Sequence, residues 1–124
     1  MTTQTDNVQA PEGYVYVCEA QELPTRGKKT VHIGDHRILI VACEAGYYAV
    51  EDRCPQTGGT IAHGEVLGCT LTTPTTGARY SLRSGRYLGG GQSWLPTNWL
   101  TVWPLRVVEG KVYVRPPQKK EQAA

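Results

Sequence analysis

The chain has 124 residues, a charged fraction of 19% and a formal net charge of +2. This length predicts one domain. The small net charge and the scattered basic residues exclude a nucleic-acid partner from our expectations. No apolar run is long enough to span a bilayer, so we expect no membrane partner either. Fourteen glycines and eight prolines favour a turn-rich β protein over a helical one.

Both ends of the chain are polar. The first ten residues lack the basic start and apolar centre of a signal peptide. We expect a disordered N-terminal tail over 1–11, a folded domain over 12–115 and a disordered tail over 116–124. The predicted location is the cytoplasm, where the four cysteines, at positions 18, 43, 54 and 69, would be reduced.

The sequence of the first half of the domain predicts short strands. A β-branched and aromatic run opens it, and one helical turn follows before Pro24. A hairpin turns at Gly34-Asp35, and another strand leads to a loop at about 52–60. The predicted strands of this half are Tyr14–Cys18, Lys29–Ile33, Arg37–Ala42 and Tyr47–Glu51.

The second half continues in the same way after an irregular stretch that ends at Gly68. A strand enters a second loop at 73–77, and a long connector precedes the last hairpin, which turns at Glu109-Gly110. The predicted strands are Cys69–Thr72, Ala78–Leu82, Arg86–Leu88, Trp103–Val108 and Lys111–Arg115. Eight to ten short antiparallel strands predict an all-β sandwich or small barrel.

The two loops carry a spaced set of residues that has the form of a metal-binding motif. Cys54-x-Gln56 is followed by sixteen residues and then by Thr73-x-x-Thr76. This frame resembles the Rieske [2Fe–2S] motif, in which Cys-x-His and Cys-x-x-His hold the two irons. The resemblance extends over about 13–115 and includes YYAVEDRCP, TGGTIAHGEV, GARYSLRSGRYLGG and VVEGKVYV. It implies a Rieske-like fold with two former cluster-binding loops.

Three of the four ligand positions hold other residues. Thiolate sulfur and imidazole nitrogen bind Fe–S irons, whereas the amide of Gln56 and the hydroxyls of Thr73 and Thr76 are weak ligands. We therefore expect no cofactor at these degenerate positions, although [2Fe–2S] is the cofactor of the family. Cys69 is expected to be a strand residue on the face of Leu71 and Thr73; a Cys54–Cys69 disulfide remains an alternative.

Other residues suggest chemistry less strongly. His32 and His36 flank a tight turn without a third ligand nearby, and structural zinc normally takes four. His63 with Cys54 is a candidate pair for nucleophilic catalysis, but no third group orients it. The glycine runs at 58–59 and 89–91 are read as ordinary turns. Arg79, Arg83 and Arg86 form a basic cluster that is either a solvated hairpin face or a surface for an acidic partner.

The connector at 89–103 carries all three tryptophans. Trp103 adjoins a strand and is expected in the core. Trp94 and Trp99 are either interface anchors or rings folded over the former ligand pocket. Together with the loop tips, they define the predicted partner-docking residues: Pro55, Gln56, Thr75, Thr76, Trp94 and Trp99.

The leading hypothesis is a cluster-free binding or structural subunit of a larger redox enzyme assembly, not catalytic on its own. Its analogue is the small subunit of assimilatory nitrite reductases, which looks like a Rieske domain without ligands. Two alternatives remain. One is a Rieske-type ferredoxin that carries electrons to a multicomponent oxygenase. The other is a small enzyme that uses the vacated pocket with Cys54 as its nucleophile.

Overall fold

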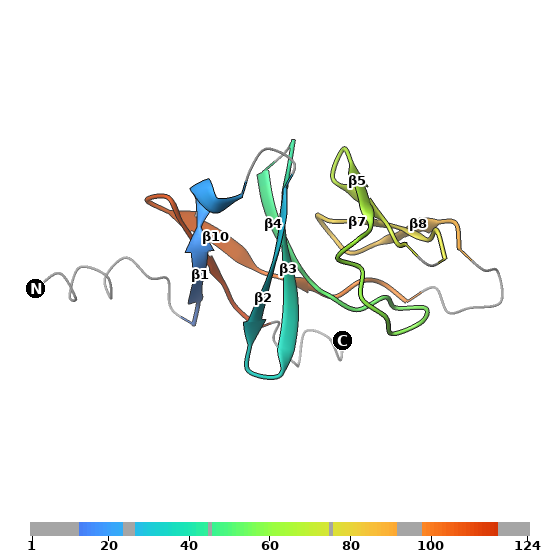
Figure 1. The fold of residues 1–124 in the computed structure, drawn as a ribbon, viewed down its shortest axis with the longest axis horizontal. Helices are drawn as coiled ribbons and strands as arrows, with labels where there is room; N and C mark the ends of the chain where they lie inside the picture. Colours follow the sequence, from blue (N-terminus) through green and yellow to red (C-terminus); the bar gives the residue numbers. More distant parts are fainter. Residues whose placement is uncertain (1–12, 24–26, 45, 75, 92–97, 117–124) are drawn as a thin grey trace, which may run out of the picture.

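The computed structural model describes residues 13–23, 27–44, 46–74, 76–91 and 98–116. In these residues eleven short strands form three antiparallel sheets, of orders β1-β11-β10, β2-β3-β4-β9 and β5-β6-β7-β8 (Figure 1). The all-β prediction is confirmed. Apart from Pro116, the tails predicted at 1–11 and 116–124 lie outside the described residues. No helix among the described residues is long and apolar enough to cross a membrane.

The central sheet has apolar layers on both of its faces. It consists of β2 (Lys28–Ile33), β3 (His36–Cys43), β4 (Gly46–Glu51) and β9 (Val102–Trp103). Along β3, Ile38 and Ile40 pack into one cluster and Leu39 and Val41 into the other. Successive strand side chains point to opposite faces, so an unbroken apolar run suits a strand that is covered on both sides.

One outer layer is the three-stranded sheet of β1 (Val15–Glu19), β11 (Lys111–Val114) and β10 (Leu105–Val108). A 3-10 turn, η1 (Ala20–Glu22), follows β1 at the place predicted for a helical turn. Cys18, Val112 and Val114 are buried against the central sheet together with Trp103, whose predicted place in the core is confirmed.

The other outer layer is the small sheet, on the right in Figure 1. It consists of β5 (Glu65–Leu67), β6 (Thr70–Thr72), β7 (Arg79–Ser81) and β8 (Tyr87–Gly89). Leu71 and Tyr80 face the central sheet and pack in one cluster with Leu39, Val41 and Val50. Both candidate loops join this cluster, since it also contains Cys54 and Ala78.

The strand count is slightly higher than the eight to ten predicted, for two reasons. β5 lies in a stretch that the sequence predicted to be irregular. Its three residues form a strand only by pairing with β6, and the sequence pattern does not show that pairing. Pro104 divides the predicted strand 103–108 into β9 and β10, which pair with different sheets. Proline has no N–H to donate to a ladder, so the chain changes sheets there.

The cysteines pair differently from either sequence-based alternative. Cys43, at the end of β3, forms a disulfide with Cys69, whereas Cys18 and Cys54 are free and buried. Cys69 is not a strand residue as predicted: it lies in the β5–β6 turn at a φ of 66°. The expectation of four reduced cysteines is therefore wrong for this pair. Sequence spacing gave no sign of it, because only the tertiary fold brings the two turns together.

Candidate functional site

The first loop, 52–60, is organised around a buried carboxylate. Asp52 accepts hydrogen bonds from the Arg37 guanidinium at 2.7 Å, the Thr60 hydroxyl at 2.9 Å and the Ile61 N–H at 2.6 Å. Its side chain is almost completely buried. Within the loop, the Cys54 N–H donates to the Gly59 carbonyl and the Gly58 N–H to the Cys54 carbonyl. Cys54 is thus held by backbone bonds that do not involve its sulfur.

These bonds also set the charge state of Asp52. Burial alone raises the pKa of this carboxyl, but the hydrogen bonds from Ile61, Arg37 and Thr60 outweigh it, and the pKa is lowered. The carboxylate is therefore ionised at neutral pH, and its hydrogen bonds join the start of the loop to its end.

The second loop is closed by the hydroxyls at its two ligand-like positions. Thr73 Oγ1 and Thr76 Oγ1 are 2.9 Å apart and share a hydrogen bond. The Ala78 N–H donates to Thr73 Oγ1 at 3.2 Å, and the Thr73 N–H donates to the Ala78 carbonyl at 2.8 Å. Thr73 is buried and Thr76 is half-buried. The two threonines thus bind each other and the loop backbone.

The two loops meet at Gly91. A Cβ atom on Gly91 would lie 2.6 Å from Gln56 Oε1 in the first loop and 3.0 Å from the Ala78 Cβ after the second. A Cβ on Gly90 would lie 2.6 Å from the Gly77 carbonyl oxygen. Both glycines also have positive φ values. The run at 89–91, which the sequence suggested was an ordinary turn, therefore lines the junction of the loops, and its three consecutive glycines are the only sequence signal of this contact.

Behind the loops, Cys54 is packed against aromatic side chains. Cys54 is 2% exposed and belongs to the same cluster as Tyr80. The Tyr80 hydroxyl is buried and has no hydrogen-bond partner within the described part of the chain. The pKa of Tyr80 is raised to about 12, mainly by burial and to a lesser extent by electrostatic interactions with Cys54 and Tyr87. The phenol stays protonated, and the Cys54 thiol is shielded from solvent.

The predicted docking residues separate into different environments. Gln56 is buried at 8% exposure, Pro55 is half-buried, and Trp99 is 59% exposed. Pro55 and Trp99 line one groove beside the first loop. Thr75 and Trp94 lie outside the described residues. Among the predicted docking residues that the structure describes, Pro55 and Trp99 thus share a surface, whereas Gln56 is buried.

The histidines His63 and His36 lie in different surroundings. His63 is exposed, and no hydrogen bond joins it to Cys54 in the part of the chain that the structure describes. His36 is engaged by Glu51, with Nδ1 2.9 Å from Oε2. No group of three or more histidine, cysteine, aspartate or glutamate side chains among the described residues is arranged to hold a metal ion.

Comparison with known proteins identifies the family. The family model of the Rieske-like [2Fe-2S] domain matches residues 13–115. The chain belongs to this family. The Rieske-like resemblance of the two loops is confirmed, including the range over which the flanking strands carry it. No curated protein matches the sequence.

Solved structures share the fold. One is a complex of reduced oxygenase and oxidised ferredoxin in carbazole 1,9a-dioxygenase (TM-score 0.74, 22% identity, 87% of this chain and 97% of that chain). Another is the carbazole 1,9a-dioxygenase ferredoxin of Nocardioides aromaticivorans IC177 (0.74, 16%, 86% and 100%). A third is a putative nitrite reductase NADPH small subunit (0.67, 23%, 82% and 96%).

The family match corrects the expectation that the protein has no cofactor. The matching model is that of a [2Fe-2S] domain, and ferredoxins are among the structural neighbours, so [2Fe–2S] is the cofactor that this family implies. The replacement of three ligand residues does not by itself show that the cluster is lost. The residues now at the four positions nevertheless do not fit that cluster, because Thr73 and Thr76 bind each other and Cys54 is the one thiol. We assign no chemical step to a cluster at these positions.

Proposed function

We propose that this Rieske-like protein is a binding component of a larger redox enzyme assembly and docks through the end of the molecule that carries the two loops. The observation that supports this role is that internal bonds hold both loops in shape: the Asp52 carboxylate organises the first, and the Thr73–Thr76 hydroxyl pair closes the second. Such internal bonds hold both loops in one shape, as a docking surface requires.

The structural neighbours supply the proposed class of partner. One neighbour is a ferredoxin in complex with its oxygenase, and another is a small subunit of a putative nitrite reductase. By analogy, the proposed partner of this chain is a protein subunit of an oxygenase or reductase. Fold analogy alone carries this step, so the partner's substrate is left open.

A photo-crosslinking experiment tests the docking role. Benzoylphenylalanine placed at Thr57 or Pro74, which are exposed in the first and second loops, should cross-link one oxidoreductase subunit in the cells of origin. The matched control is Val107, which is exposed on β10 in the opposite outer sheet. Equal cross-linking from Val107, or loop products that contain no oxidoreductase, would contradict the proposal.

The second candidate function is electron transfer as a Rieske ferredoxin, which the family model and the ferredoxin neighbours favour. Iron and acid-labile sulfide analysis of protein purified without oxygen separates the two candidates. Stoichiometric iron and sulfide with a Rieske-type visible spectrum would establish an electron carrier with unexpected ligands. A folded, iron-free protein that still cross-links an oxidoreductase would leave the docking role as the better account.

The cytoplasm is the proposed location. Disulfides are uncommon in that compartment, so the state of the Cys43–Cys69 pair is a direct check. Rapid acid quenching of cells followed by differential alkylation would measure it. Complete oxidation of the pair in vivo would argue for an oxidising compartment.

A further inference from the structure

The groove beside the first loop is a mixed aromatic and charged surface. It has a volume of about 370 Å³, is open to solvent, and is lined by Glu51, Arg53, Pro55, Asn98, Trp99 and Thr101. Leu100 is buried in the core, so its neighbours in this extended segment, Trp99 and Thr101, point outward. We call this surface the Trp99 groove.

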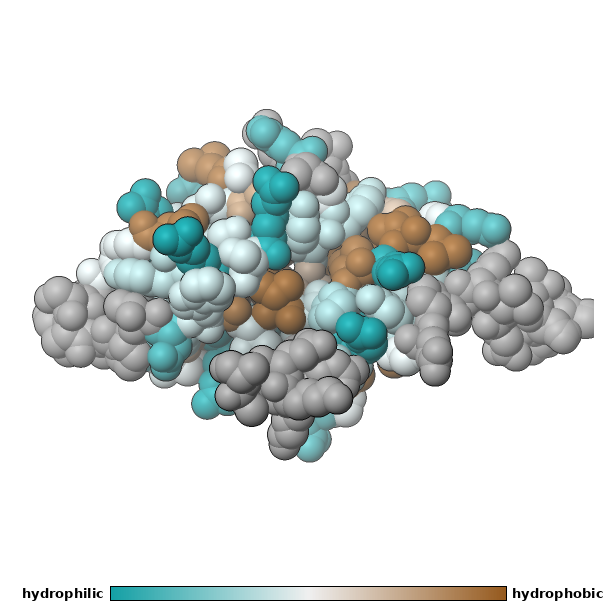
Figure 2. All heavy atoms as spheres, turned by 180° about the vertical axis from the view of Figure 1, so that it is seen from behind, coloured by the Kyte–Doolittle hydropathy of each residue, from teal (hydrophilic) through white to brown (hydrophobic). Residues whose placement is uncertain are grey.

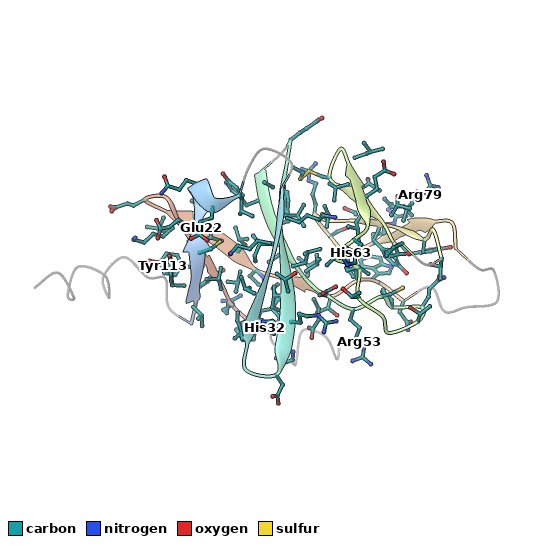
Figure 3. The ribbon with its side chains drawn as sticks, in the orientation of Figure 1. Glu22, His32, Arg53, His63, Arg79 and Tyr113 are labelled. Atoms are coloured by element: carbon teal, nitrogen blue, oxygen red, sulfur yellow. A yellow bond between two sulfur atoms is a disulfide. The ribbon has the colours of Figure 1, made fainter. Side chains whose placement is uncertain are left out.

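Glu51, the acidic residue of the groove, already has hydrogen-bond partners within the protein. Glu51 accepts a hydrogen bond from Trp103 Nε1 at 3.1 Å on one carboxylate oxygen and contacts His36 Nδ1 at 2.9 Å on the other. The Arg53 side chain, in contrast, has no hydrogen bond or ion pair within the described part of the chain. Figure 3 shows it projecting outward from the ribbon. The charge that the groove leaves unmatched is therefore positive.

Further positive charge lies close to the same segment. The Leu100 N–H donates to the Gly85 carbonyl at 2.8 Å, and a Cβ on Gly85 would lie 2.1 Å from the Leu100 carbonyl oxygen. The turn that contains Gly85 also carries Arg83 and Arg86, both exposed. Two members of the basic cluster, Arg83 and Arg86, are thus on a turn that is held against the segment that presents Trp99, whereas Arg79 lies outside that turn.

Among the exposed large apolar side chains of the described residues, Trp99 is the one tryptophan. Figure 2 shows the back of the molecule with its apolar atoms in separate patches between hydrophilic side chains. Trp99 combines a large exposed ring with an adjacent unmatched guanidinium. Tryptophan and arginine are the residues most enriched in the parts of interfaces that contribute most to binding.

We propose that the Trp99 groove binds an acidic segment of the partner protein, with an aromatic or aliphatic side chain against Trp99 and a carboxylate on Arg53. Guanidinium–carboxylate pairs are directional and stronger than neutral hydrogen bonds, so Arg53 would set the register of the segment. This inference rests on the proposed docking function and places a binding determinant on the side of the loop end, apart from the ligand-like positions.

The first test uses a probe of defined chemistry. The peptide acetyl-Asp-Glu-Phe-Glu-Asp-amide is titrated into ¹⁵N-labelled protein, and amide and indole shifts are followed. We expect shifts at Arg53, Trp99 and Thr101 and binding that weakens as salt rises. A Lys-for-acid peptide that binds equally well, or no shift at these residues at millimolar peptide, would overturn the proposal.

Variants at exposed positions, which we expect to leave the fold intact, sharpen the test. Trp99→Ala or Arg53→Glu should raise the peptide Kd at least about tenfold. Arg79→Glu makes the same charge change on an exposed arginine that Figure 3 places well apart from Arg53, and it should change the Kd less than about twofold. An equal loss in all three variants would show non-specific electrostatic attraction and overturn the assignment.

The remaining outcomes separate this inference from the function on which it rests. Peptide binding at Trp99 without any cross-linked oxidoreductase would support the groove and count against the docking function. A cross-linked oxidoreductase whose affinity is unchanged by Trp99→Ala would support the function and overturn the groove. Benzoate binding as tightly as the peptide, or a dimer abolished by Trp99→Ala, would replace the partner segment by a small carboxylate or a second copy.

Discussion

The two loops meet at Gly91 but are held in shape by different interactions. The first depends on a buried charge, since Asp52 binds groups from β3 and from the end of the loop itself. The second depends on neutral hydroxyls, Thr73 and Thr76, and on the strand that leads into it. That strand, β6, begins beside Cys69, which the disulfide joins to the central sheet. The shape of the first loop is therefore maintained by a charge, and that of the second by hydroxyls with a covalent anchor.

Removal of the covalent anchor should have the largest effect. The disulfide closes a sequence separation of 26 residues, and the Cys43→Ser/Cys69→Ser variant should lose about 3 kcal/mol of unfolding free energy because its unfolded chain is less constrained. Urea denaturation with and without reductant measures this. The wild type should be sensitive to reductant and the variant insensitive. Alkylation of Cys43 and Cys69 in unreduced protein would contradict the pairing.

Loss of the buried charge should come next. Asp52→Ala removes the acceptor for Arg37, Thr60 and Ile61, and the buried Ile61 N–H is left without its partner. We expect a loss of about 2 kcal/mol in urea denaturation. Asp35→Ala, at an exposed turn position, is the control and should be nearly neutral. Equal effects of the two variants would show that the first loop is not organised by Asp52.

Disruption of the hydroxyl pair should have a smaller effect. Thr73→Val keeps the shape of the side chain but removes the oxygen that pairs with Thr76 and accepts from the Ala78 N–H. A loss of about 1 kcal/mol is expected. Thr70→Val, half-buried in β6 outside the loop, should change stability by less than about 0.5 kcal/mol. A Thr73→Val/Thr76→Val double variant should be less destabilised than the sum of the two single variants.

The loops should also differ in their response to acid, the smallest of these effects. The pKa of Asp52 is lower in the folded protein than in the unfolded chain, so its contribution is fully present above the unfolded value of about 4 and is lost as pH falls through the folded value. The stability gap between wild type and Asp52→Asn should therefore shrink towards low pH. The gap for Thr73→Val should stay constant. A gap for Asp52→Asn that does not change with pH would contradict an ionised Asp52.

Two hairpin turns and the strand β3 could be predicted from short-range sequence pattern. The β2–β3 turn at Gly34-Asp35 and the β10–β11 turn at Glu109-Gly110 lie where the sequence placed them, because these two-residue turns depend on local backbone preferences. The apolar run in β3 likewise marks a strand. β5 could not be found in this way, because its three residues form a strand only by pairing with β6.

The spacing of the ligand-like positions predicted only part of the candidate site. Spacing located Cys54, Gln56, Thr73 and Thr76, and the family match confirms the frame that they occupy. Spacing could not show that the two threonines bind each other, nor that Gly91 sits between Gln56 and Ala78. These contacts join segments that meet only when the small sheet packs on the central one.

By itself the sequence determined the family and the positions of the two loops, because both depend on residue types and spacings that any member of the fold must repeat. The tertiary structure alone decided that Cys69 pairs with Cys43, that Asp52 is the buried centre of the first loop, and that Trp99 stands outward beside Arg53. The physical reason is that a side chain's partners and exposure depend on distant segments, and their distance is set by packing and not by sequence separation.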